Sequence, residues 1–139
     1  MPYFQTIAID ITNFLIPFLV GSLIFFAAII APNTFIVLDQ KNARRFLRFI
    51  FPKLYLWSLI ISLVLTTLSF FYNFLIGLIL LFISFGFLFS QKYLVKFINS
   101  ASDIPRKNER QKKFRILHTT SIVIFMSQII LLLLIDFYI

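Results

Sequence analysis

Cysteine is absent from this 139-residue sequence, and histidine occurs only once, as His118. Without cysteine the chain can form no disulfide, no thiol nucleophile and no thiolate ligand for a metal ion. A single histidine leaves no pair that could hold a haem or a metal, so a further ligand would have to come from another chain. The sequence also has no nucleophile beside a base and no glycine-rich phosphate loop. We therefore expect no enzyme, no cofactor and no metal site.

Charged residues are scarce, and acidic residues are the scarcer kind. The sequence has five Asp and Glu against thirteen Lys and Arg, and charged residues make up 13% of it. Hydrophobic residues make up 60% and aromatic residues 19%, which is more apolar surface than a soluble core of this length can bury. The composition therefore indicates an integral membrane protein.

Three stretches contain no charged residue at all, namely residues 11–38, 54–91 and 116–135. About 20 helical residues cross a hydrocarbon core about 30 Å thick, so the middle stretch is long enough for two passes. Ser69, Tyr72 and Asn73 interrupt its aliphatic run, which predicts a hairpin with a very short connection. We expect an all-α fold, an integral membrane antiparallel four-helix bundle that forms one domain over residues 1–139. The expected spans are about 11–32, 53–71, 74–98 and 112–137.

The positive charges predict the orientation of the chain. All thirteen fall in two segments, residues 41–53 and 92–115, and four passes place these segments on the same side. Short basic loops stay in the cytoplasm, so we expect both termini on the outer, periplasmic side of the cell inner membrane. No basic segment precedes the first span, which is therefore expected to be a retained anchor. Cations beside membrane spans match anionic lipid headgroups, so membrane lipids are an expected partner and nucleic acid is not.

Residues 40–50 carry apolar and basic side chains at helical spacing. One face has Ala43, Phe46, Leu47 and Ile50, and the other has Lys41, Arg44, Arg45 and Arg48. This pattern predicts an amphipathic helix lying on the inner leaflet; the alternative is a continuation of a bundle helix, packed on protein. The residues expected to meet lipid headgroups are Lys41, Arg48, Lys112, Lys113 and Arg115.

Two prolines and an aspartate predict helix boundaries. Pro32 follows a long charge-free run, so we expect a kink or a helix end near residues 31–34. Asp103 stands where a helix cap would, and Pro105 falls in the first turn that would follow. The fourth helix is therefore expected to begin well before its apolar run.

Small and polar side chains form a stripe on each expected span. The stripes are Asn13, Pro17, Gly21, Ala28 and Pro32 on the first; Tyr55, Ser58, Ser62, Thr66 and Ser69 on the second; Gly77, Ser84 and Gln91 on the third; and His118, Ser121, Phe125 and Gln128 on the fourth. Apolar burial does not drive helices together in lipid, so such stripes are typical of faces that meet. Interhelical hydrogen bonds and close packing are the expected role; the lining of a permeation path or ligand pocket is the alternative.

His118 lies three residues after Arg115, at the inner boundary of the fourth span. We expect its imidazole to bond a group at the same depth on an adjacent helix, such as Tyr55 or a carbonyl near Pro32. A metal ligand or a proton carrier is the alternative.

Two blocks of the sequence resemble a known family. The block GSLIFFAAIIAPNTFIVLDQKNARRFLRFIFPKLY, and the later INSASD followed by FRILHTTS, are similar to the signatures of the eukaryotic transmembrane protein two-hundred-and-five and its bacterial relatives. The matching positions are Gly21, Phe25, Phe26, Ala31, Pro32, Phe35, Leu38, Arg44 or Arg45, Phe51, Pro52 and Tyr55 in the first block, and Asn99, Ala101, Asp103, Phe114, Leu117, His118 and Ser121 in the second. The relatives often carry arginine after the histidine, where this chain has Thr119.

The resemblance implies a four-span domain and names no reaction. It implies bacterial members of unknown function and a loose link of the eukaryotic branch to drug and metal tolerance. Its signatures direct attention to the cytoplasmic half, where we expect a functional face of Pro32, Arg44, Arg45, Pro52, Tyr55, Asp103, His118 and Ser121. Four spans enclose little beyond their own side chains, so we expect a homo-oligomer or an accessory subunit with a membrane protein partner. The alternatives are an oligomeric small exporter or channel, and a haem- or quinone-binding redox helper.

Single cysteines introduced at Ser102 and at Tyr72 test the expected orientation. In intact cells a membrane-impermeant maleimide should label the cysteine at 72 and not the one at 102, because the basic segment around 102 is expected to stay inside. Labelling of the cysteine at 102 from outside would reverse the orientation.

Overall fold

The computed structural model describes residues 2–139, and all regular secondary structure in this part of the chain is helical, without strands. Its elements are α1 (Pro2–Phe25), η1 (Phe26–Ile30), α2 (Ala31–Val37), α3 (Gln40–Phe70), α4 (Phe74–Phe89), η2 (Ser90–Leu94), α5 (Val95–Ser102) and α6 (Lys107–Tyr138). The π-helical turns η1 and η2 join their neighbours without a break, so the chain forms four long helices. Each of the four is long and apolar enough to cross a membrane, which confirms the expected number of candidate spans.

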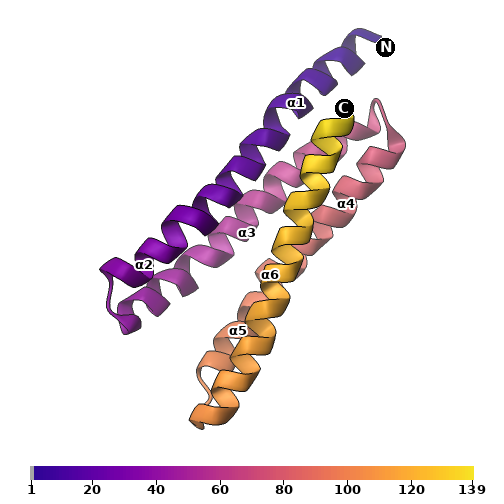
Figure 1. Ribbon diagram of the computed structural model, residues 1–139. Coiled ribbons are helices and arrows are strands. Elements are labelled where there is room, and N and C mark those ends of the chain that lie inside the picture. Colours follow the sequence, from indigo (N-terminus) through magenta and orange to yellow (C-terminus); the bar gives the residue numbers. More distant parts are fainter. Residues whose placement is uncertain (1) are drawn as a thin grey trace.

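The helices run back and forth between two ends of the molecule (Figure 1). Both chain ends and the turn between α3 and α4 lie at one end, and the α2–α3 and α5–α6 connections lie at the other. The second helix packs on the whole third one, since α3 contacts α4, η2 and α5, whereas α1 packs on α3 and α6. Residues 41–53 begin α3 and residues 92–115 surround the α5–α6 connection, so every Lys and Arg gathers toward the second end. We call this the basic end.

A three-residue turn joins α3 to α4 at residues 71–73. The Asn73 side chain caps α4 by accepting a hydrogen bond from the Ile76 amide at 3.2 Å. The hydroxyls of Ser69 and Tyr72 lie 3.1 Å apart, and the Gln5 amide nitrogen donates to the Phe71 carbonyl at 3.1 Å. The predicted hairpin is therefore confirmed.

Pro32 distorts the first long helix without ending it. Proline lacks an amide hydrogen, and its ring presses on the carbonyl of the residue four positions earlier. The turn before it, η1, is wider than an α-turn, and the Ala31 amide bonds the Phe26 carbonyl five residues back. The helix then continues as α2 to Val37. The chain thus has a π-helical turn at residues 26–30, shortly before Pro32, and the helix end expected near residues 31–34 is absent.

Residues 40–50 are the first three turns of α3. They continue into the apolar part of the helix without a break, although Pro52 lies inside it. Pro52 removes only the hydrogen bond that position 52 would donate to the Arg48 carbonyl, which a long helix tolerates. Ala43 is completely buried against the rest of the chain. The expectation of a separate interfacial helix over 40–50 is therefore wrong, and its alternative, a continuation of a bundle helix, describes the structure.

The interior between α3 and α4 contains the stripe predicted on the second span, whose five residues are all buried. The Ser84 hydroxyl of α4 lies 2.9 Å from the Ser62 hydroxyl of α3 and 3.4 Å from that of Thr66. Each of these three oxygens also bonds a backbone carbonyl one turn earlier in its own helix. The hydroxyls therefore satisfy one another where the two helices meet, as the packing interpretation predicts.

The stripe predicted on the first span faces outward, so that prediction is wrong. Its five residues, Asn13, Pro17, Gly21, Ala28 and Pro32, are exposed. The buried face of α1 instead carries Thr12, Ile16, Leu19 and Leu23, which are completely buried. Large aliphatic side chains fill the space between α1 and its neighbours, where small ones would leave a void and lose dispersion contacts.

Gln128 is the polar residue through which α6 meets α4. Its side chain is buried, and its amide nitrogen donates to the Ile83 carbonyl at 3.2 Å. Gly86 makes room for it, since a Cβ at position 86 would lie 2.5 Å from the Gln128 amide nitrogen. Of the stripe predicted on the fourth span, Gln128 is therefore buried, Ser121 and Phe125 are half-buried, and His118 is exposed.

The substitution Gly86→Ala should destabilise the protein by about 1 kcal/mol, because the new methyl group displaces the Gln128 amide from the Ile83 carbonyl. Gly21→Ala is the matched control: a Cβ there meets nothing within 4 Å, and alanine is the better helix former. Thermal unfolding followed by circular dichroism in detergent compares the two. Equal stability of both variants would contradict the packing of α6 on α4.

Candidate functional site

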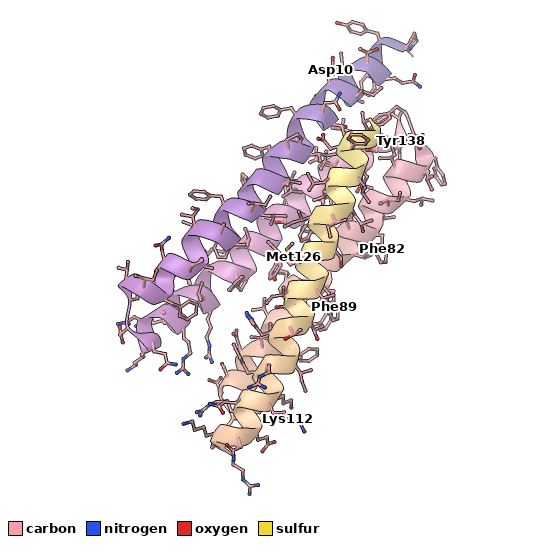
Figure 2. All side chains as sticks on the ribbon, viewed as in Figure 1. Asp10, Phe82, Phe89, Lys112, Met126 and Tyr138 are labelled. Carbon is pink, nitrogen blue, oxygen red and sulfur yellow. The ribbon has the colours of Figure 1, made fainter. Side chains whose placement is uncertain are left out.

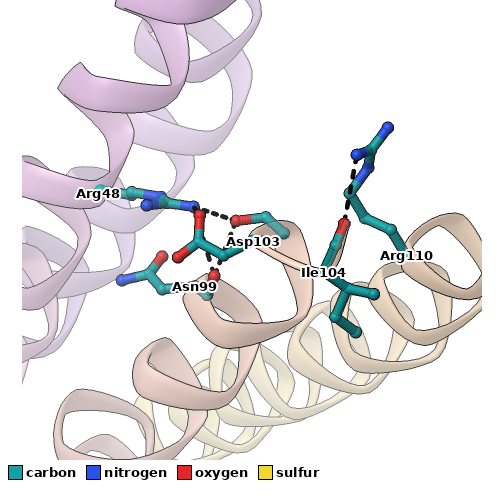
Figure 3. A network of polar contacts seen from close by, with 6 residues as sticks. Arg48, Asn99, Asp103, Ile104 and Arg110 are labelled. Atoms are coloured by element: carbon teal, nitrogen blue, oxygen red, sulfur yellow. Dashed lines mark hydrogen bonds and ion pairs between the residues drawn. The ribbon is translucent and has the colours of Figure 1, made fainter. Parts of the chain in front are cut away.

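At the basic end, one arginine links the second and third helices. The Arg48 Nη2 atom donates to the Asp103 carboxylate at 2.7 Å, to the Asn99 carbonyl at 3.3 Å and to the Ser102 hydroxyl. Figure 3 shows the Arg48 side chain reaching from α3 to the C-terminal end of α5, where these three acceptors converge. The Arg48–Asp103 ion pair thus fixes the position of α5 against α3, although both side chains are partly exposed, at 36% and 64%.

The register of the hairpin explains why Arg48 meets these partners. Ser62 faces Ser84 across the α3–α4 interface, and the same register places Arg48 opposite residue 98. A π-helical turn accommodates one extra residue, so η2 moves the facing position to Asn99. The three acceptors lie within one turn of that point.

Asp103 does not cap the fourth helix, so that prediction is wrong. It is the first residue after α5, and α6 begins at Lys107 with Arg106 at its cap position. Pro105 holds the residue before it out of the helical region, so the helix starts later than expected, and the Asp103 carboxylate bonds Arg48. Arg110 adds a second contact in this loop by donating to the Ile104 carbonyl at 3.3 Å. The helix nevertheless begins well before the apolar run at residue 116, as predicted.

The predicted functional face is not one cluster. Tyr55 is buried and stacks on Phe51, whose ring in turn meets Phe26 edge-on. Pro52 and Ser121 are half-buried, whereas Pro32, Arg44, Arg45 and His118 are exposed. Within α6 the Ser121 hydroxyl donates to the His118 carbonyl at 2.7 Å. Asp103 instead bonds Arg48, which we expected to meet lipid headgroups. The other expected headgroup residues, Lys41, Lys112, Lys113 and Arg115, are exposed.

His118 does not bond an adjacent helix, which corrects the expectation from the sequence. Its ring stacks on Phe114 of the same helix, with 5.5 Å between the ring centres and 9° between the planes. The imidazole is exposed, and α6 packs on α1, α4, η2 and α5 but not on α3, which carries Tyr55, or on α2, which carries Pro32. Among the described residues, no three His, Asp or Glu side chains lie close enough together to hold a metal ion.

A shallow, open depression lies on α3 beside the Arg48 network. It is lined by Asn42, Arg45, Phe46, Arg48 and Phe49. The Lys53 ammonium sits 4.3 Å from the centre of the Phe49 ring, in a cation–π contact. The helical pattern of residues 40–50 predicted the two arginines and Phe46 from the sequence, but not Asn42, Phe49 or Ser102. Helical spacing on α3 could have found Phe49; Ser102 depends on the register set by η2.

No family model, no curated protein and no solved structure matches this chain.

Arg48→Ala and Asp103→Ala, alone and combined, measure the ion pair as a double-mutant cycle. We expect a coupling energy of about 0.5 kcal/mol, the usual size for a partly exposed pair. The same cycle with Arg45→Ala in place of Arg48→Ala is the control and should give a coupling near zero. Thermal stability of the purified protein supplies the energies. A coupling as large for Arg45 as for Arg48 would contradict the arrangement in Figure 3.

Proposed function

We propose that this chain is a non-enzymatic protein of the cell inner membrane that acts as an oligomer or as an accessory subunit of a membrane complex. Its four helices form an antiparallel bundle across the bilayer, with the basic end in the cytoplasm and both termini on the periplasmic side. The gathering of all thirteen Lys and Arg toward one end supports this orientation, since short basic segments stay in the cytoplasm.

The main support for the proposal is the exposure of α6 over residues 107–127. No side chain in this stretch is buried; the first buried residue is Gln128. Along α4 and η2, by contrast, a buried residue occurs in every turn, from Ile76 to Leu94. We call residues 107–127 the uncovered stretch. About two thirds of the fourth helix, 21 of its 32 residues, therefore has no fully buried side chain.

Residues 116–127 of this stretch belong to the apolar run, and their exposed side chains favour contact with another helix over contact with lipid alone. Thr119, Val123 and Ser127 recur four residues apart and share an exposed face, and Thr120 lies beside them. The Thr120 and Ser127 hydroxyls bond their own helix backbone at 2.8 and 2.7 Å. Small hydroxyl residues on a helix surface in lipid favour close approach of another helix. A second copy or a different membrane protein fits this face.

The family resemblance also points to the basic end as the functional part of the molecule. Asn99 and Asp103 belong to its second block, and both contact Arg48, which lies inside its first block. We propose on this basis that the chain is related to the family of transmembrane protein two-hundred-and-five. The two blocks then share a structural task, the joining of α3 to α5.

An exporter or channel receives less support. The hydroxyls that would line its path, on Ser62, Thr66 and Ser84, bond one another and their own backbone. A redox helper would need ligands from a second chain, because His118 is the single histidine. Either role therefore also requires an assembly of several chains.

Cross-linking in membranes tests the proposal. A cysteine at Val123, in the uncovered stretch, should be joined by a short bismaleimide to a second copy or to another membrane protein. A cysteine at Phe82 is the control, because this side chain is 71% exposed on the outer face of α4 (Figure 2) and is expected to face lipid. We expect a several-fold higher yield of cross-linked product at 123. Equal yields at the two positions, or none at 123, would contradict the proposal.

A further inference from the structure

We propose that the depression on α3 binds the phosphate of one anionic phospholipid of the inner leaflet, with Arg45 and Arg48 as its ligands. The inference rests on the proposed function in one respect, the placement of the basic end at the inner leaflet. It goes beyond it by naming a single site, the residues that hold the lipid and the chemical class of the ligand.

The lining residues combine the two chemistries that a phospholipid presents. Asn42, Arg45, Phe46 and Phe49 follow the spacing that puts side chains on one face of a helix, and Arg48 flanks them. The Phe46 and Phe49 rings are exposed, at 38% and 65%, and offer an apolar surface to glycerol and the first acyl methylenes. The depression therefore fits an amphipathic ligand better than a free inorganic anion.

Arg48 is already oriented for a second ligand. All three of its hydrogen bonds within the described residues are made by Nη2, to the acceptors on and just after α5. Its Nη1 and Nε atoms have no partner there. The Nη1 and Nε groups can each donate a charge-assisted hydrogen bond to a phosphate oxygen, and a guanidinium held on one side loses less freedom on binding. The α5 contact thus holds the arginine while leaving its other donors available.

Arg45 supplies an unpaired cation at the same place. It makes no hydrogen bond or ion pair within residues 2–139, although it lines the depression together with Arg48. Lys53, held over the Phe49 ring, adds a third positive charge nearby. At the basic end only Asp39, Asp103 and Glu109 oppose the thirteen cations, because the remaining acids, Asp10 and Asp136, are near the chain ends. The excess of positive charge complements an anionic headgroup.

Lipid retention by the full-length protein tests the site. The protein is purified in mild detergent, and binding of added phosphatidylglycerol is measured by native mass spectrometry against phosphatidylcholine, whose headgroup has no net charge. We expect one phosphatidylglycerol to bind selectively, and Arg45→Gln to weaken its binding about tenfold, the usual effect of losing a charge-assisted phosphate contact. Lys107→Gln is the matched control, since it removes the same charge at the basic end outside the depression and should leave binding unchanged. Helicity measured by circular dichroism verifies the fold of each variant.

Three outcomes would overturn the site. Equal weakening by Lys107→Gln would mean a diffuse electrostatic attraction, and an unchanged affinity of the Arg45→Gln protein would mean that this arginine is not a ligand. Displacement of the lipid by inorganic phosphate at similar concentration would mean a site for a free anion. The lipid measurement does not depend on cross-linking at Val123, so failure of the lipid site and failure of the proposed assembly are told apart.

Discussion

The contact of Ser84 with Ser62 and Thr66 is the interaction on which the rest of this structure depends. Four helices with apolar surfaces gain little from hiding those surfaces from lipid, so specific polar contacts and close packing must decide which faces meet. The three hydroxyls fix the rotation and the register of the α3–α4 hairpin. That hairpin is the platform on which α1 packs with large aliphatic residues and α6 packs through Gln128. The same register brings Arg48, about two turns of α3 before Tyr55, to its partners on and just after α5.

The two halves of the molecule are held in different ways. The half with the chain ends is closed by buried side chains from all four long helices, among them Leu19, Leu65, Leu80 and Leu132. At the basic end, α6 has no fully buried side chain over residues 107–127, and the Arg48 network joins α3 to α5 through partly exposed groups. Contacts of this kind contribute little stability in water. The basic end is thus the less completely packed half of the molecule. Both the proposed protein partner and the proposed phospholipid bind in this half.

The sequence predicted the features that depend on local pattern. A break in an aliphatic run was enough to find the turn at residues 71–73, and hydroxyls at steps of three and four were enough to find the buried face of α3. The predictions were wrong where a residue's position depends on the side-chain volume that the interior requires, or on a partner far away in the sequence. The small residues of α1 face outward because Ile16, Leu19 and Leu23 fill the interior better. Asp103 has the right type for a helix cap, but it bonds an arginine 55 residues away, and the π-helical turn that aligns them has no sequence signature we recognised.

The mass of the particle extracted from native membranes in mild detergent tests the central claim most directly, namely that the chain is incomplete along the uncovered stretch of α6. With bound lipid counted separately, the account predicts two or more copies of the chain, or one copy with another membrane protein in fixed ratio. Replacing Thr119 and Val123 by leucine should reduce that association and leave the fold intact. A single copy that stays folded alone, with only lipid around α6, would contradict the account.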